Sequence, residues 1–272
     1  SPVTTLTQHS SRWLILTAVL LLAALMRFVA LDRVPPGWRD DELIEIGMDS
    51  RIAQGWRPLY IREAEGHEPL YHYLHAGTLT LFGHNTYGYR WLPAAFGALS
   101  TALLVSIVWR LFGFPIAALT GALYAVGLWP VMYSRFGVRH IGVMPFILLA
   151  LYALSQITHL KGSCTRLNFT FKTRPPAPAR PGWSHSQSRV EFGLWPLIFG
   201  LSMGLGLYVY YAAWVMPVLT LAWGAYLLVF DRARFKRAWL GLALALVIAA
   251  IVFAPLGLEL ARGPRVTRIQ VT

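Results

Sequence analysis

Long runs of apolar residues are the feature that most constrains how this chain can fold. The run at 13–31, WLILTAVLLLAALMRFVAL, is long enough to cross a bilayer as a helix. Further runs of similar length lie at 91–109, 115–133, 142–160, 193–209, 213–230 and 239–256. Of the 272 residues, 56% are hydrophobic and 13% are charged, whereas soluble domains have about 25% charged residues. The sequence therefore predicts an all-α polytopic membrane protein, with 1–272 as a single transmembrane domain.

The distribution of charge predicts how these spans are oriented. The net charge is +12, yet nine of the twelve carboxylates lie between Asp32 and Glu68, against five arginines. Two later loops are basic, at 161–191 and 231–237. Because loops rich in Lys and Arg stay on the cytoplasmic side, we expect the N-terminus and both basic loops inside and the segment 32–90 outside. The basic charge then reflects membrane topology and indicates no nucleic-acid partner.

The connection at 161–191 is rich in Pro, Ser and Arg, which predicts a flexible cytoplasmic loop. Its glycosylation sequon at Asn168 would be unused on that side of the membrane. The single cysteine, Cys164, excludes a disulfide within the chain. The first apolar run predicts a retained signal anchor, and we expect the chain to be an N-terminal fragment of a longer protein.

The outer segment 32–90 predicts two short helices at the membrane surface. The first covers 41–54 and ends before Gly55, and the second starts at Pro69. Four acids of the first helix fall within an arc of about 100° and so share one face: Asp41, Glu42, Glu45 and Asp49. The sequence therefore predicts an interfacial helix with its acids turned to one side.

The acids of WRDDELIE, at the start of the first outer helix, have two interpretations. Acids in the first turn stabilise a helix through its dipole, and Asp40 suits the N-cap position. Alternatively, an ionised carboxylate here accepts a proton from an acceptor hydroxyl or amine. The two roles are compatible, because Asp40 can cap the helix while Asp41 acts as the base.

Histidines concentrate in the next segment, GHEPLYHYLH at 66–75. His72 and His75 share a helix face, and together with His67 or Glu68 they could bind a divalent metal. No tight metal-binding motif is present, so we assign no metal ligand and leave the cofactor unknown. The plainer interpretation places these side chains and Tyr71 at the depth of the lipid headgroups.

Arginines lie in the expected outer loop YSRFGVRH, against the usual charge bias. Arg135 and Arg139 could bind a lipid-linked phosphate through paired hydrogen bonds, or pair with the outer acids or with lipid headgroups. Arg90 is a further candidate for substrate binding, whereas Arg27, within the first run, needs a local partner. The aromatic stretch 208–214 is interpreted as a membrane belt, with a wall for a sugar or prenyl chain as the alternative.

These motifs occur in a recognisable order: WRDDELIE, GHEPLYHYLHAGTLTLFG, RWLPAAFGALSTALLVSIVWRLFG and YSRFGVRHIGVMPF. The order resembles the GT-C membrane glycosyltransferases of the protein O-mannosyltransferase and aminoarabinose-transferase type. The resemblance implies a GT-C-type transmembrane helix bundle that transfers a sugar from a polyprenyl-phosphate donor to a protein or lipid acceptor. It implies a reaction at the outer face of the cell membrane, among membrane lipids.

The resemblance also implies roles for single residues. Asp41 is the expected base, with Glu42 beside it. Six residues are expected to bind the donor phosphate or the substrate: His67, Glu68, Tyr71, Arg90, Arg135 and Arg139. Glu68 stands where some relatives have Lys, and the loop after Arg135 lacks the acid that relatives often have there, so a second catalytic carboxylate is not evident.

Two other classes of function compete with a transferase. A transporter or flippase would have ionisable residues near the middle of the membrane, or helices broken there. Apart from Arg27, the apolar runs are free of such residues, and the charges gather at the outer rim, which favours the transferase. A catalytically inactive scaffold is the third possibility.

Overall fold

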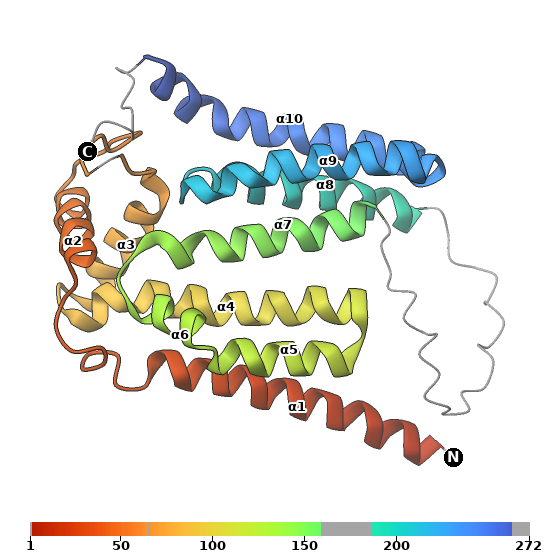
Figure 1. The fold of residues 1–272 in the computed structure, drawn as a ribbon, viewed down its shortest axis with the longest axis horizontal. Coiled ribbons are helices and arrows are strands. Elements are labelled where there is room, and N and C mark those ends of the chain that lie inside the picture. The colour runs from red at the N-terminus through yellow and green to blue at the C-terminus, as the bar shows by residue number, and fades with distance from the viewer. Residues whose placement is uncertain (1, 65, 159–185, 263–272) are drawn as a thin grey trace.

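The computed structural model describes residues 2–64, 66–158 and 186–262 (Figure 1). Within these ranges the chain is helical, and its only β-type pairing is an isolated bridge between Ile61 and His67. The elements, with η for short 3-10 helices, are α1 Pro2–Phe28, α2 Asp40–Ala53, α3 Pro69–Phe82, α4 Thr86–Phe112, α5 Phe114–Val126, α6 Leu128–Arg135, η1 Arg139–Gly142, α7 Val143–Ile157, α8 Ser186–Gly206, η3 Tyr211–Trp214, α9 Val215–Phe230 and α10 Arg232–Arg262.

Most of the predicted loop 161–191, with Asn168 and Cys164, lies outside the described residues. The prediction of a loop is wrong for the last part of this segment, because α8 begins at Ser186. The two short helices predicted within 32–90 are confirmed as α2 and α3, whereas their outer position stays a prediction.

Each of the seven apolar runs coincides with helical structure, but their lengths differ from the prediction. Five helices among the described residues are long and apolar enough to cross a membrane: Ser10–Phe28, Thr86–Phe112, Arg139–Ile157, Tyr211–Phe230 and Arg232–Arg262. The run at 193–209 contributes only a shorter apolar helix, Gly193–Gly206. That these helices cross a membrane stays a prediction.

The run at 115–133 is not one straight helix but the pair α5 and α6, bent by 52°. Pro130 explains the break, since it lacks an N–H group and its ring clashes with the carbonyl four residues earlier. Arg27 of α1 donates to the carbonyls of Tyr124 (3.3 Å) and Ala125 (3.2 Å) and to the Ser134 hydroxyl (3.2 Å). The buried charge predicted to need a partner therefore binds the backbone groups exposed by the break.

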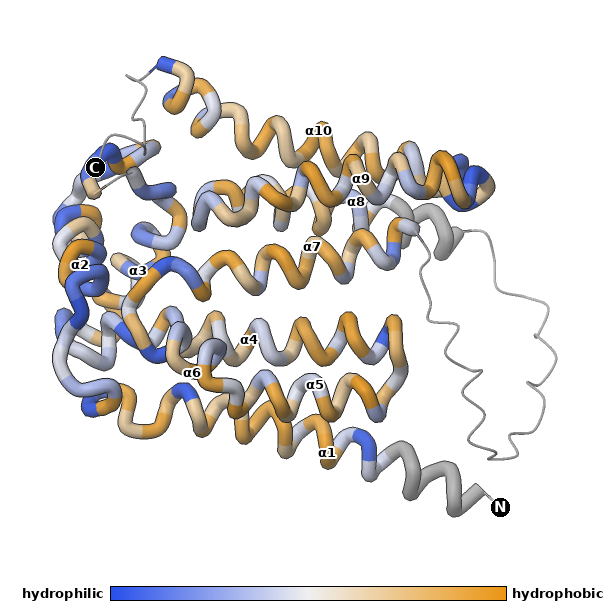
Figure 2. Tube along the Cα trace, viewed as in Figure 1, coloured by the Kyte–Doolittle hydropathy of each residue, from blue (hydrophilic) through white to orange (hydrophobic). Residues whose placement is uncertain are grey.

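The helices form a bundle with α2 and α3 lying across one end of it (Figure 1). Helices α1, α4 and α5 pack together on one side, and α8, α9 and α10 on the other, with α7 between them. The start of α1 and the connection from α9 to α10 lie at the end opposite to α2 and α3. Hydrophilic residues concentrate towards the two ends, and apolar residues dominate the helices between them (Figure 2).

Small residues allow α8 and α10 to approach each other closely. A Cβ atom on Gly200 would lie 2.6 Å from the Ala245 carbonyl oxygen, and one on Gly204 would lie 2.7 Å from Val252 Cβ. Such contacts need glycine, as is usual where membrane helices pack closely.

An apolar cluster of Met48, Ile52, Ile61 and Ala76 holds α2 against α3. This packing fixes the position of the layer that carries the acids.

Candidate functional site

The first turn of α2 is anchored by Glu42 rather than by Asp40. The helix begins at Asp40 with Arg39 as its N-cap residue, so the expected capping role of Asp40 is wrong. The Glu42 carboxylate instead accepts from the backbone N–H of Arg39 (3.1 Å) and from that of Gly137 (2.8 Å). Glu42 thereby ties the start of α2 to the loop before η1.

Arg90 completes this anchor from the start of α4. Its guanidinium donates to Glu42 Oε1 (3.1 Å) and Oε2 (3.3 Å), and to the carbonyls of Pro35 and Gly37 (both 2.6 Å). Both side chains of the ion pair are fully buried. Glu42 and Arg90 therefore lie outside the pocket and hold the backbone from which Asp41 projects.

Arg135, a second expected phosphate ligand, binds the end of α1. Its guanidinium donates to the carbonyls of Met26 (2.9 Å), Val29 (2.8 Å) and Val34 (2.8 Å). A helix leaves its last carbonyls without partners inside the helix, and a cation there also suits the helix dipole. The structure thus places Arg135 as a cap on α1, away from the pocket.

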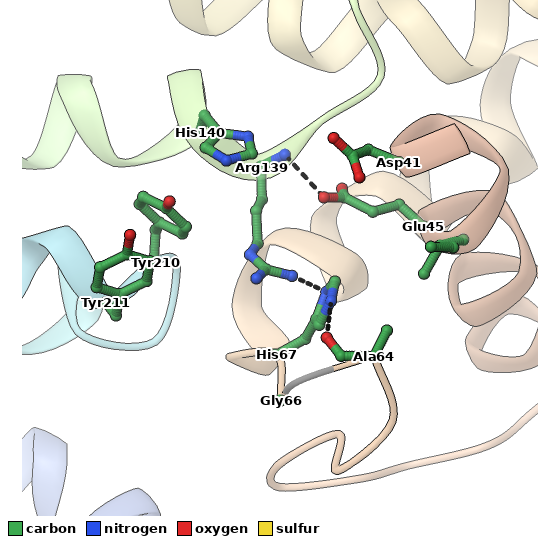
Figure 3. A pocket seen from close by; sticks show the side chains of 10 residues that line it. Asp41, Glu45, Ala64, Gly66, His67, Arg139, His140, Tyr210 and Tyr211 are labelled. Carbon is green, nitrogen blue, oxygen red and sulfur yellow. Dashed lines mark hydrogen bonds between the residues drawn. The ribbon is translucent and has the colours of Figure 1, made fainter. Parts of the chain in front are cut away.

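A pocket of about 550 Å³ opens beside α2 (Figure 3). Its lining residues come from α2, from the segment before α3, from η1 and from the region of η3: Asp41, Ile44, Glu45, Ala64, Gly66, His67, Arg139, His140, Tyr210 and Tyr211. Of the predicted site residues, Asp41, His67 and Arg139 line it. Asp41 is exposed, and its carboxylate makes no hydrogen bond or ion pair within the described part of the chain.

Glu45 lies one helical turn after Asp41 and lines the same pocket. Only 3% of its surface is exposed, and its Oε1 accepts a hydrogen bond from the Arg139 backbone N–H (3.3 Å). Burial raises the pKa of Glu45 to about 8, opposed by the charge of Arg139 and reinforced by that of Asp49. Two carboxyl groups of one helix face thus differ in environment, one solvated and one buried, which is a pattern typical of active sites.

Arg139 provides the positive charge of the pocket, and His67 lies beside it. His67 donates from Nε2 to the Ala64 carbonyl (3.1 Å), which leaves Nδ1 as an acceptor for the Arg139 guanidinium and for His72 Nε2 (3.0 Å). The Arg139 guanidinium also lies over the Tyr210 ring, 5.5 Å from its centroid. The position of Arg139 is therefore fixed from two sides, by a histidine and by an aromatic face.

Behind His67, the buried carboxylate of Asp49 binds His72 and His75, the two histidines whose spacing suggested a metal site. Asp49 accepts from His72 Nδ1 and His75 Nδ1, both at 2.6 Å. The other ring nitrogen of His75 contacts the Tyr89 carbonyl, so both nitrogens of His75 face acceptors and both carry protons. Burial alone would lower the pKa of His75, but the charge and hydrogen bond of Asp49 and the carbonyl raise it.

In the part of the chain that the structure describes, no three side chains of the metal-ligating kind are grouped to hold a metal ion. Glu68 precedes α3 and is buried, and Tyr71 is fully buried in an apolar cluster with Leu92 and Val143. Neither of these two predicted substrate ligands lines the pocket.

Sequence reasoning missed Glu45 as a lining residue and placed the tyrosines differently. The four-residue spacing from Asp41 to Glu45 was a usable signal, since such pairs share a helix face. Tyr210 and Tyr211, interpreted as part of a membrane belt, form a wall of the pocket, their rings 4.4 Å apart. That wall agrees with the alternative of a surface for a sugar or prenyl chain.

Comparisons with known proteins bear on the fold of the chain. The family model for dolichyl-phosphate-mannose-protein mannosyltransferase matches residues 66–169. Among solved structures, ArnT from Cupriavidus metallidurans bound to undecaprenyl phosphate is similar, with a TM-score of 0.63 and 19% identity over 93% of this chain. The chain has the GT-C fold. A comparison with curated protein sequences finds no match.

The resemblance to the GT-C glycosyltransferases that the motifs predicted is thus confirmed. The family match covers the segments that carry His67 and Arg139, whereas Asp41 lies before it. This GT-C chain spans 42% of the length of the ArnT chain.

Proposed function

We propose that the protein transfers a sugar from a polyprenyl-phosphate carrier to a hydroxyl or amine acceptor at the outer face of the cell membrane. The observation that carries this proposal is the pocket between Asp41, Glu45 and Arg139. It combines an accessible carboxylate with a cation at the end of the bundle where α2 and α3 lie. A water-borne acceptor and a lipid-borne donor can meet at such a place.

The reaction follows from these groups. The Asp41 carboxylate accepts the proton of the acceptor hydroxyl or amine as its oxygen or nitrogen attacks the anomeric carbon of the donor. The bond between that carbon and the phosphate oxygen breaks, and its electron pair leaves with the polyprenyl phosphate. The charges of Arg139 and of the nearby histidine network stabilise the phosphate as it leaves.

Arg27 bears on the transporter alternative. A transporter was expected to have broken helices or charges within the membrane, and the chain has both, in the α5–α6 break and in Arg27. Yet Arg27 is fully buried and donates to protein groups at that break, as an internal structural cation would. This arrangement gives Arg27 a structural role, so Arg27 does not favour a transporter over a transferase.

The test is sugar transfer in proteoliposomes by the natural full-length protein, with a panel of labelled polyprenyl-phosphate sugars. Asp41→Asn should lower kcat by about 100-fold or more, the range of a lost general base, while the donor still binds. Asp40→Asn is the matched control, because Asp40 is an exposed acid in the same helical turn that does not line the pocket. Equal activity in the two variants would refute Asp41 as the base, and no transfer from any donor would refute the proposal.

A further inference from the structure

Glu45 lines the pocket and has one carboxyl oxygen without a partner. Its Oε1 accepts from the Arg139 backbone, but its Oε2 is buried and has no hydrogen-bond partner among the described residues. A buried polar oxygen left in this state is costly, and such atoms often mark a place where a ligand binds. The side chain lies between Asp41 and the Arg139 backbone in the wall of the pocket (Figure 3).

The surroundings of Glu45 favour its neutral, protonated form. Burial has the largest effect on its pKa, which is raised to about 8. Other titratable or charged groups face it or the adjoining pocket from each neighbouring element: Asp41 and Asp49 on α2, Tyr71 and His75 on α3, His67 before α3, Arg139 and His140 on η1, and Tyr210 before η3. This environment favours a carboxylic acid at neutral pH, whose O–H donor has no acceptor among the described residues.

We propose that Glu45 is the second acid of this pocket and binds the phosphate of the lipid-linked donor by donating a hydrogen bond from its carboxylic acid. This inference rests on the proposed function, because it assumes a polyprenyl-phosphate donor. The partner must be an anion, since the pocket also presents Arg139, and a hydrogen bond from a neutral acid to a charged oxygen is short and strong. An ionised Glu45 would repel the same phosphate.

A protonated binding group has a direct consequence for pH. As the pH rises through the pKa of Glu45, the donor O–H becomes a negative charge, so affinity for the lipid phosphate falls. With one proton and a pKa of about 8, the protonated fraction decreases by about 25-fold between roughly pH 7.5 and pH 9.5. A phosphate monoester is almost fully ionised throughout this window, because its second pKa is about 6, so the probe itself does not titrate.

The experiment measures binding of undecaprenyl phosphate to the full-length protein in nanodiscs across this window. Wild-type affinity should fall by up to about 25-fold, whereas Glu45→Gln, which keeps an N–H donor and cannot ionise, should bind with a much smaller slope, the part that the histidines contribute. Glu45→Ala should bind weakly at every pH. Glu63→Gln is the matched control and should retain the wild-type slope, because Glu63 is an exposed glutamate that Arg51 holds in its ionised form.

The outcomes separate this inference from the proposed function. The role of Glu45 is overturned if the wild type binds with a pH slope that Glu45→Gln fully retains, or if the wild type binds with no pH slope. Either result leaves the transferase proposal intact. Absence of lipid-phosphate binding at any pH overturns both. If Glu45→Gln fails to fold, infrared titration of the wild type decides. The inference requires a carboxylic-acid C=O band that disappears near pH 8 and that shifts when undecaprenyl phosphate is added. A carboxyl group already ionised at pH 7 would refute the inference.

Discussion

Removing Arg90 from its buried ion pair should destabilise the protein strongly. The pair with Glu42 is fully buried, and removal of one partner of such a pair costs about 3–5 kcal/mol of unfolding free energy. In Arg90→Met, the Glu42 carboxylate keeps two backbone donors, the N–H groups of Arg39 and Gly137. These donors offset part of the loss, so we expect a cost near the lower end, about 3 kcal/mol.

The reverse substitution should cost more. In Glu42→Gln the guanidinium charge of Arg90 stays buried, with the carbonyls of Pro35 and Gly37, the Trp38 ring and a neutral amide as partners. We expect about 4–5 kcal/mol, and a double variant that is less destabilised than the sum of the two by about 2–3 kcal/mol.

The assay is denaturant unfolding in detergent micelles, followed by tryptophan fluorescence, for both single variants and the double variant. The exposed pair of Arg51 and Glu63 provides the matched control, where Arg51→Met and Glu63→Gln should each cost less than about 1 kcal/mol. The reasoning is refuted if the buried-pair variants are as mild as these controls, or if their effects simply add.

Two further predictions concern neighbouring contacts. Arg135→Leu should lower the unfolding free energy by about 1.5–3 kcal/mol through the lost bonds to α1 while leaving undecaprenyl-phosphate affinity unchanged; a tenfold loss of affinity in nanodisc binding would contradict this. The Asp49–His75 pair should make stability depend on pH. Burial raises the pKa of Asp49, but the two histidines lower it overall, so its contribution is lost as the pH falls below about 4. The raised pKa of His75 makes its contribution complete below about pH 6.5 and lost as the pH rises through its folded-state pKa. The melting temperatures of the wild type and Asp49→Asn should therefore differ most between roughly pH 4 and 6.5, and this difference should shrink at alkaline pH.

The fold was predictable from the sequence wherever local pattern decides it. Long apolar runs predicted the helices of the bundle, and Gly55 and Pro69 correctly marked the end of α2 and the start of α3. The bend at Pro130 was missed, because run length alone does not report a break. Arg27 could be recognised as needing a partner, but its partners lie about 100 residues away, beyond the reach of local reasoning.

The site was less predictable, because packing decides what each polar residue does. Arg135 was expected to bind phosphate, yet it caps α1 through contacts that only the folded chain creates. The spacing of His72 and His75 suited a metal, but a carboxylate from another helix takes their Nδ1 atoms. Identity and spacing indicated which residues share a face, and not which element covers that face.

The face of α2 shows how one repeat produces three different carboxyl groups. Asp41, Glu45 and Asp49 are four residues apart, so they follow one another along a single face of the helix. The first is exposed, the second is buried with a raised pKa, and the third is buried with a lowered pKa because two histidines bind it. Depth alone does not order these pKa values, since Asp49 is the more deeply buried of the last two.

What differs is the partner that each carboxyl group meets. Asp49 binds His72, His72 contacts His67, and His67 accepts from the Arg139 guanidinium, so a continuous set of hydrogen bonds connects α2 to the cationic wall of the pocket. Both oxygens of the Asp49 carboxylate are thus paired with histidines of this network. Glu45 has no such partner for its second oxygen, and for that reason it is the acid of this helix face that is available to a ligand.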